Sequence, residues 1–199
     1  MKNRSLMYIC KVGILSALAA VLMLLEFPLP FIAPPFYKLD FSELPVLIGS
    51  FALGPLAGVL IELLKNLLNL LFEGTTTAFV GELANFLMGC AFVLPAAFFY
   101  RAKKTRSAAL LGMTLGTFSL TVVGTVVNYF VLIPMYSVLY NLPIDAIVGM
   151  GQAINPAISN LPLLVVLAVA PFNLIKGAVI SALTFVLYKR VSPLLKERY

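Results

Sequence analysis

The sequence is dominated by long stretches without charge. No charged residue occurs between Arg106 and Asp145, and the stretches from Lys11 to Glu26 and from Lys176 to Lys189 are also uncharged and rich in Leu, Val, Ala and Phe. A helix needs about 20 apolar residues to cross a hydrocarbon core of about 30 Å. Backbone in lipid must also satisfy its own hydrogen bonds. With 61% hydrophobic and 11% charged residues, the chain is predicted to be an all-α integral membrane protein.

Glycine, proline and charged residues divide the chain into six predicted transmembrane helices in one domain, residues 1–199. The predicted helices are 11–27, 43–54, 56–72, 78–100, 107–133 and 163–190. The Gly54-Pro55 pair separates the short second helix from the third, the fifth is expected to end near Pro134, and Pro171 predicts a kink in the sixth. The first helix resembles a signal sequence, but it has no clear cleavage site, so we expect it to be retained.

Two connections are long enough to form part of a site. The segment 28–42 contains prolines at 28, 30, 34 and 35, which exclude a regular helix and predict an extended loop. The polar segment 141–162 is predicted to hold a short interfacial helix. Thr76 or Thr77 is expected to cap the fourth transmembrane helix.

The basic residues predict the orientation. Most of them fall in three groups that six helices place on one side: Lys2, Arg4 and Lys11; Arg101, Lys103, Lys104 and Arg106; Lys189, Arg190, Lys196 and Arg198. Cytoplasmic loops carry an excess of Lys and Arg. Both termini are therefore predicted to be cytoplasmic. Because these charges flank apolar runs and form no basic face, a nucleic-acid partner is not expected.

The remaining polar groups converge near the opposite side. Glu26, Asp40, Glu43, Glu73 and Asp145 are expected at the outer rim, and the groups expected within helices are Glu62, Lys65, Asn66, Asn69, Glu82, Asn85, Asn128, Asn173 and Lys176. An ionisable residue within the membrane is a functional candidate by default. Asn173 and Lys176 are the strongest pair, because they lie one helical turn apart and no acid is near them on their own helix.

Some of these groups have a structural alternative. Glu62 and Lys65 are spaced for an ion pair within one helix, and Lys65 is long enough to snorkel outward. Asn66 and Asn69 are equally compatible with helix–helix hydrogen bonds. An intramembrane enzyme is disfavoured, because the chain has no histidine, two cysteines and no aspartate-rich motif; no metal site and no cofactor are expected. A purely structural membrane subunit would leave the one-sided convergence unexplained.

Small residues on the first helix form a second candidate surface. Gly13 with Ala17, and Ser16 with Ala20, are two small-xxx-small pairs on neighbouring faces. Such surfaces allow another helix to approach closely. Both internal packing and the docking of a partner fit this spacing.

Four segments, in this order, resemble a known family: FYKLDFSELPVLIGSFALGPLAGVLIELLKNLL, TTTAFVGELANFLMG, NYF and PFNLIKG. They are similar to the substrate-binding S component of energy-coupling factor (ECF) vitamin transporters, in particular the riboflavin-binding subfamily. The resemblance covers residues 8 to 190. It implies a six-helix subunit of the bacterial cell membrane that captures riboflavin from outside and then associates with a transmembrane coupling subunit and two ATP-binding subunits.

The resemblance also implies particular residues. Asn128, Asn173 and Lys176 would bind riboflavin, the stretch Leu39, Asp40 and Phe41 would contribute from the loop, and we add Glu82 and Asn85 from the polar convergence. The first helix is similar to the AxxxA-type docking surface of these subunits, although Gly13 and Ser16 replace alanine. An Asn side chain pairs well with the donor–acceptor edge of isoalloxazine. An unpaired lysine suits an anion better, so a flavin phosphate or another vitamin remains an alternative ligand.

Overall fold

The computed structural model describes the backbone of residues 2–195 and the side chains of residues 5–188. Lys196, Glu197 and Arg198 of the predicted cytoplasmic tail lie outside the described residues. The helices are α1 (Lys2–Leu24), α2 (Glu43–Leu53), α3 (Pro55–Glu73), α4 (Val80–Lys103), α5 (Arg106–Val127), α6 (Ile133–Leu139), α7 (Ile144–Gln152), α8 (Leu161–Leu164) and α9 (Ala170–Leu195). Two π-helical turns, η1 (Asn128–Leu132) and η2 (Val165–Val169), join α5 to α6 and α8 to α9. Strands β1 (Phe27–Pro28) and β2 (Lys38–Leu39) form a small antiparallel ribbon.

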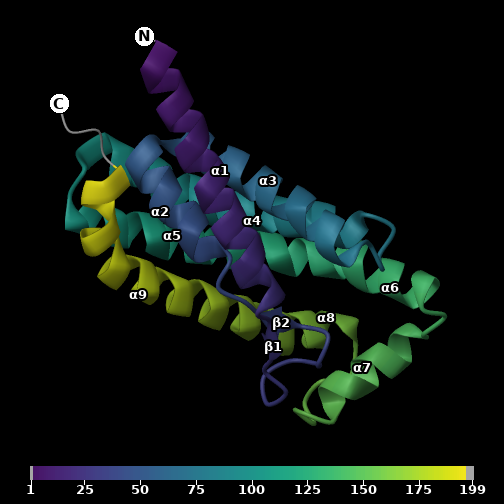
Figure 1. Cartoon of the computed structure of the whole chain (residues 1–199). Coiled ribbons are helices and arrows are strands. Elements are labelled where there is room, and N and C mark those ends of the chain that lie inside the picture. The colour runs from purple at the N-terminus through teal and green to yellow at the C-terminus, as the bar shows by residue number, and fades with distance from the viewer. Residues whose placement is uncertain (1, 196–199) are drawn as a thin grey trace.

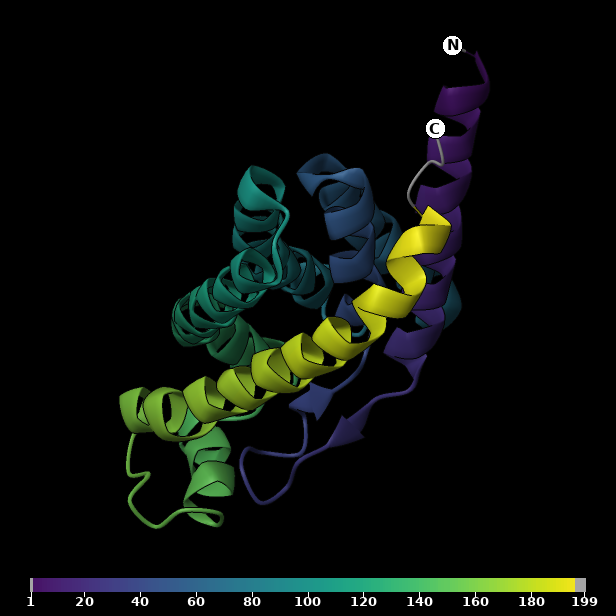
Figure 2. The same cartoon turned by 90° about the vertical axis from the view of Figure 1, so that its left-hand side faces the viewer.

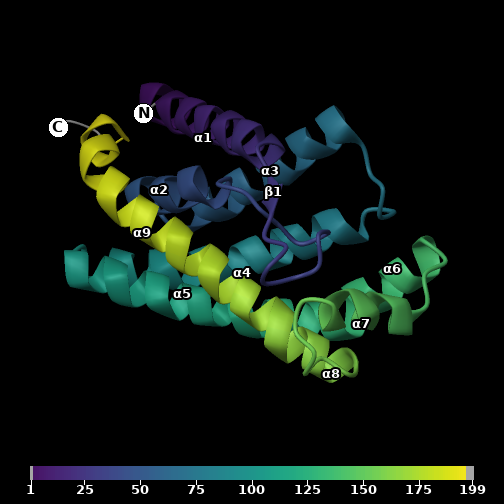
Figure 3. The same ribbon diagram turned by 90° about the horizontal axis from the view of Figure 1, so that it is seen from below.

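The two ends of the molecule differ in character. The start of α1, the end of α9 and the turn between α4 and α5 lie at one end (Figures 1 and 3). The β1–β2 ribbon, α7 and α8 lie at the other end, and α9 runs obliquely along the length of the molecule between the two (Figure 2). This arrangement agrees with the predicted grouping of the basic segments on one side.

Most helices lie where the sequence predicts them, but α1 begins at Lys2 rather than at residue 11 and ends at Leu24, and α2 is short. Among the described residues, five helical segments are long and apolar enough to cross a membrane, and α2 has only 11 residues. At 1.5 Å per residue, α2 is about 16 Å long, far less than a hydrocarbon core of about 30 Å. The prediction of six membrane-crossing helices is therefore not confirmed, because α2 does not cross the membrane by itself.

The predicted helix end at Pro134 is wrong, because the helical backbone continues to Leu139. Proline removes one backbone donor. The π-turn η1 accommodates this change: the amide of Ile133 donates to the carbonyl of Asn128, five residues back, and Pro134 falls in the first turn of α6. A similar π-turn, η2, lies just before Pro171. The predicted irregularity at Pro171 therefore takes the form of a widened turn.

The outer surface is strongly apolar. Large side chains that are mostly exposed occur on every long helix, including Ile14, Leu56, Leu71, Phe118 and Val186. A soluble protein rarely exposes so much contiguous apolar area. This surface is suited to contact with lipid.

Helices α4 and α5 pack very closely through glycine. A Cβ atom at Gly116 would lie 2.3 Å from the carbonyl oxygen of Phe92, and one at Gly112 would lie 2.8 Å from that of Ala96. The two glycines form a GxxxG spacing on α5, which permits backbone contact between helices. This seam fixes one wall of the polar interior.

We expect Gly116→Val to destabilise the fold by about 1–3 kcal/mol, because the new side chain would press against α4 backbone that cannot rotate away. Thermal unfolding in detergent measures this loss. Gly149→Ala is the matched control, since a Cβ there meets nothing within 4 Å. Equal melting temperatures for the two variants would contradict the proposed seam.

Candidate functional site

A cavity of about 520 Å³ lies among the β1–β2 segment, α3, α4, α5 and α9. Six of the eight predicted ligand-binding residues line it: Asp40, Glu82, Asn85, Asn128, Asn173 and Lys176. Aromatic side chains contribute to the wall from four parts of the chain: Phe36 and Tyr37, Phe92, Tyr136, and Phe172. The volume falls in the range of ordinary small-molecule pockets, about 300–1,000 Å³.

Leu39 and Phe41 are not among the cavity-lining residues. Leu39 is buried in an apolar cluster with Ile133 and Val148, and Phe41 packs beside the same cluster. Successive side chains in extended backbone point to opposite sides. Asp40 therefore faces the cavity, whereas its two neighbours anchor the loop to the helices.

Asn128 and Asn173 are held by the helices that carry them. The Nδ2 atom of Asn128 donates to the carbonyl of Gly124 at 2.8 Å, and that of Asn173 donates to the carbonyl of Val169 at 3.1 Å. Asn128 begins η1, and Val169 ends η2. Both amides are thus positioned beside a π-turn, a feature often found at functional sites.

Gly124 allows the two amides to approach each other. A Cβ atom at Gly124 would lie 2.7 Å from Nδ2 of Asn173, and the carbonyl of Gly124 is the acceptor for Asn128. From the loop, the hydroxyl of Tyr37 donates to Oδ1 of Asn128 at 2.7 Å. Tyr37 was not among the predicted site residues. The sequence feature that could have indicated its role is the presence of an aromatic residue in the proline-rich loop.

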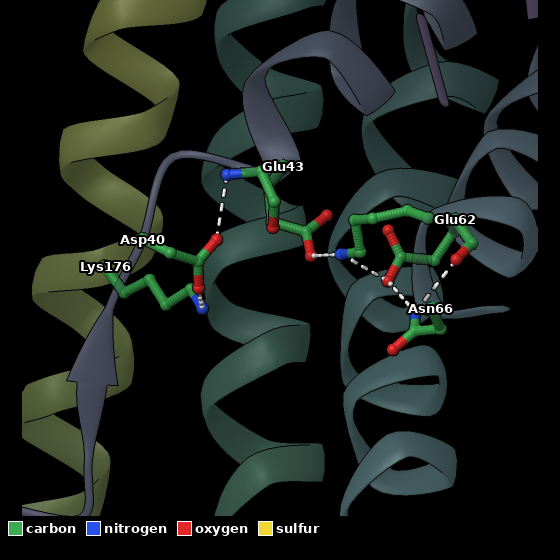
Figure 4. A network of polar contacts seen from close by, with 7 residues as sticks. Asp40, Glu43, Glu62, Asn66 and Lys176 are labelled. Carbon is green, nitrogen blue, oxygen red and sulfur yellow. Dashed lines mark hydrogen bonds and ion pairs between the residues drawn. The ribbon is translucent and has the colours of Figure 1, made fainter. Parts of the chain in front are cut away.

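Lys176 pairs with an acid from the loop. Its Nζ atom lies 2.8 Å from Oδ2 of Asp40, while Oδ1 of Asp40 accepts from the amide of Ser42 at 2.8 Å (Figure 4). Burial alone would raise the pKa of Asp40, but the nearby charges of Lys176 and Lys65 and the two hydrogen bonds lower it to about 2. The carboxylate is therefore ionised at neutral pH and neutralises Lys176.

Glu82 is held by a threonine from the turn before α4. Its Oε2 atom accepts from the hydroxyl of Thr77 at 3.0 Å, and Oγ1 of Thr77 in turn accepts from the amide of Gly81. Thr77 thus contacts the first turn of α4, although Phe79 is the residue that immediately precedes the helix.

A second ion-pair cluster extends from the cavity wall between α2 and α3. Lys65 lies 2.7 Å from both Glu43 and Glu62, and Asn66 donates to Glu62 at 3.0 Å (Figure 4). The predicted Glu62–Lys65 pair is confirmed. The expectation that Lys65 snorkels outward is wrong, because its side chain is 0% exposed. Glu43 is buried rather than at the outer rim, because it approaches Lys65 from the start of α2.

The structure divides the small residues of α1 into two faces. Gly13 and Ala17 are exposed, whereas Ser16 and Ala20 are buried at 1% and 0%. Ser16 and Ala20 serve packing within the chain, since α1 lies against α2 and α3. Only the Gly13 and Ala17 face is open to another helix.

Over the part of the chain whose side chains are described, no group of three or more His, Cys, Asp or Glu residues is arranged to hold a metal ion. The site therefore consists of amides, ion pairs and aromatic walls. Such a set can bind and orient a small molecule through hydrogen bonds and ring contacts.

Comparison with known proteins identifies the class. Residues 7–188 match the family described as "ECF transporter, substrate-specific component", and the chain belongs to this family. A solved structure described as "Structure and mechanism of the S component of a bacterial ECF transporter" superposes with a TM-score of 0.74 at 37% identity, covering 99% of this chain and 100% of that one.

Two curated relatives are similar over nearly the whole chain. The "Riboflavin transporter RibU" of Staphylococcus aureus (strain TCH60) is 40% identical, and the alignment covers 94% of this chain and 90% of that protein. The "Riboflavin transporter FmnP" of Bacillus subtilis (strain 168) is 33% identical, with 94% and 93% covered.

We expect Asp40→Asn to lower the stability at pH 7 by about 3 kcal/mol, because it leaves the largely buried Lys176 without its partner. Since the folded pKa of Asp40 is lowered to about 2, its contribution is present above the unfolded pKa of about 4 and is lost as the pH falls from about 4 to 2. Melting temperatures across this range should therefore fall less in the variant than in the wild type. Parallel profiles would contradict the role of the pair.

Proposed function

We propose that this chain is the riboflavin-binding subunit of an ECF transporter. It captures riboflavin from outside the cell and delivers it to a transmembrane coupling subunit driven by two ATP-binding subunits. In this proposal the chain has no catalytic activity and needs no cofactor, its termini face the cytoplasm, and the cavity opens to the outside of the cell membrane.

The observation that carries the proposal is the neutralisation of Lys176 by Asp40. An unpaired lysine in the cavity would favour an anionic ligand. With the ion pair formed, the cavity lining includes the amides of Asn128 and Asn173, one compensated charge pair and aromatic rings. This environment favours a neutral ligand that is flat and bears hydrogen-bonding groups at one edge.

Riboflavin meets these requirements. Its pyrimidine edge alternates donors and acceptors, which the amide groups of Asn128 and Asn173 can match. The ammonium group of Lys176 has three donors, and its bond to Asp40 uses one, so others remain for carbonyl or ribityl oxygens. Tyr37 and Phe172, whose ring centroids are 5.7 Å apart, provide an aromatic surface for the ring system.

We expect the purified protein to bind riboflavin stoichiometrically and to quench its fluorescence. Three substitutions, Asn128→Ala, Asn173→Ala and Lys176→Ala, should each weaken binding at least tenfold. Each removes a polar side chain from the cavity wall and leaves the riboflavin group that it would contact buried without a hydrogen-bond partner.

Matched controls distinguish a site effect from a general one. Gln152→Ala removes an exposed amide from α7, and Lys103→Ala removes an exposed lysine at the end of α4. Both should leave the titration unchanged. A folded wild-type protein that does not bind riboflavin would refute the proposed ligand, and mass spectrometry of the co-purified molecule would then identify the alternative.

We further propose that the exposed face formed by Gly13 and Ala17 docks on the coupling subunit. Gly13→Leu or Ala17→Leu should abolish co-purification with the coupling and ATP-binding subunits while riboflavin affinity stays unchanged, since the larger side chain prevents close helix approach. Thr114→Leu, an exposed substitution on α5, is the control. Retained assembly in both α1 variants would place the docking surface elsewhere.

A further inference from the structure

The cluster of Glu43, Lys65 and Glu62 is not accounted for by ligand binding. Glu62 and Lys65 are 0% exposed and Glu43 is 4% exposed. Only Glu43 of the three lines the cavity. A buried ion pair contributes little stability unless its geometry and hydrogen bonds are complete. Burying these three charged groups therefore costs free energy, and ligand binding does not account for it.

The buried charges around this cluster do not balance. Three carboxyl groups, from Asp40, Glu43 and Glu62, are paired with two ammonium groups, from Lys65 and Lys176. Because Asp40 and Lys176 neutralise each other, the surplus negative charge falls on Glu43 and Glu62, which share Lys65. The first turn of α2 contributes a helix dipole equivalent to about half a positive charge, which does not cancel a full one.

The hydrogen bonds are also incomplete when both carboxyls are ionised. One oxygen of each, Oε1, accepts from Lys65, and the other, Oε2, is buried without a partner. Both Oε1 atoms lie 2.7 Å from the same Lys65 nitrogen, so the two carboxyl groups lie side by side. Two carboxylates have only acceptors. A hydrogen bond between them therefore needs one proton.

We propose that Glu43 and Glu62 form a proton-binding site in which the two carboxyl groups share one proton at neutral pH. The proton enters from water in the cavity, which Glu43 lines, and forms an O–H bond on one carboxyl whose hydrogen is donated to the other. The proton and Lys65 together neutralise the two acids. The whole buried set of charges is then neutral.

The packing favours a proton over a metal cation. The backbone of α4 presses on Glu62 at Gly89, where a Cβ atom would lie 2.3 Å from Oε1 of Glu62. The third charged group of the cluster is already an ammonium, Lys65, at 2.7 Å from each acid. The other titratable groups facing the cluster are Cys90 from α4 and Asp40 from the loop. A proton needs no additional space in this arrangement.

The site links protonation to the state of the cavity. When a ligand displaces water from beside Glu43, ionisation of both carboxyls becomes less favourable, because the charged forms lose solvation. Ligand binding at alkaline pH should therefore be accompanied by proton uptake. This consequence rests on the proposed function, whereas the proton itself does not.

Infrared spectroscopy of the ligand-free full chain in detergent tests the proton directly. At pH 7 the wild type should show the carbonyl stretch of a buried protonated carboxyl, sensitive to deuterium and lost at alkaline pH. Glu62→Gln and Glu43→Gln should each lack it, because one remaining carboxylate pairs with Lys65. Glu82→Gln, which changes a cavity acid outside the cluster, should retain it.

Thermal unfolding gives a second readout. The wild type should lose stability as the pH rises from about 4, where an unfolded glutamate ionises, to the pH at which the shared proton leaves, and each single Gln variant should lack this loss. The double variant, which carries both Glu43→Gln and Glu62→Gln, should be strongly destabilised because Lys65 is left unpaired. Absence of the infrared band in the wild type, or its persistence in both single variants, overturns the proposal. A melting temperature that rises with Na⁺ but not with choline, in the absence of the band, identifies a metal cation instead.

Discussion

The ion pair between Lys176 and Asp40 is the contact on which the site depends. The proline-rich segment that carries Asp40 has little backbone support, since β1 and β2 contain only two residues each. Side-chain contacts therefore hold it against the helices. The ion pair fixes the loop to α9, and the hydroxyl of Tyr37 fixes it to Asn128 at the start of η1. The same two contacts form the cavity and close one side of it.

Glycine makes the polar interior possible by bringing helices close enough for buried groups to meet. Gly124 leaves room for Asn173, Gly89 leaves room for Glu62, and Gly116 brings α5 against the backbone of α4. At Gly124 and Gly89 a polar side chain of one helix faces the backbone of another. Water has little access there, so each polar group must find its partner within the protein. This explains why the buried amides bond back to carbonyls of their own helices.

The sequence predicts the positions of most helices well, because an apolar run that ends at charged residues or at Gly-Pro indicates a helix buried in the membrane. The predicted helix topology alone also places four of the cavity residues in one region: Asp40, Asn128, Asn173 and Lys176. It does not predict which charges pair, since Asp40 and Lys176 are 136 residues apart and no periodicity relates them. Local spacing found Glu62 as a partner of Lys65 but could not find Glu43, which arrives from another helix.

Errors in the predicted details have the same origin. Leu39 and Phe41 were expected at the site because the family resemblance implied the whole stretch with Asp40, but alternation of the backbone turns them toward apolar side chains. Pro134 was expected to end a helix because it lacks a donor, but a π-turn compensates for that loss. In each case the outcome depends on how neighbouring elements pack, which a single stretch of sequence does not contain.

Helix α1 has one exposed face and one buried face. The exposed face has the small residues Gly13 and Ala17. On the buried face, Ser16 and Ala20 pack within the chain, where α1 lies against α2 and α3. The helix that receives α1 on that side, α2, also begins at Glu43, in the wall of the cavity. Met23, near the end of α1, also lines the cavity, so a displacement of α1 would act directly on the cavity wall.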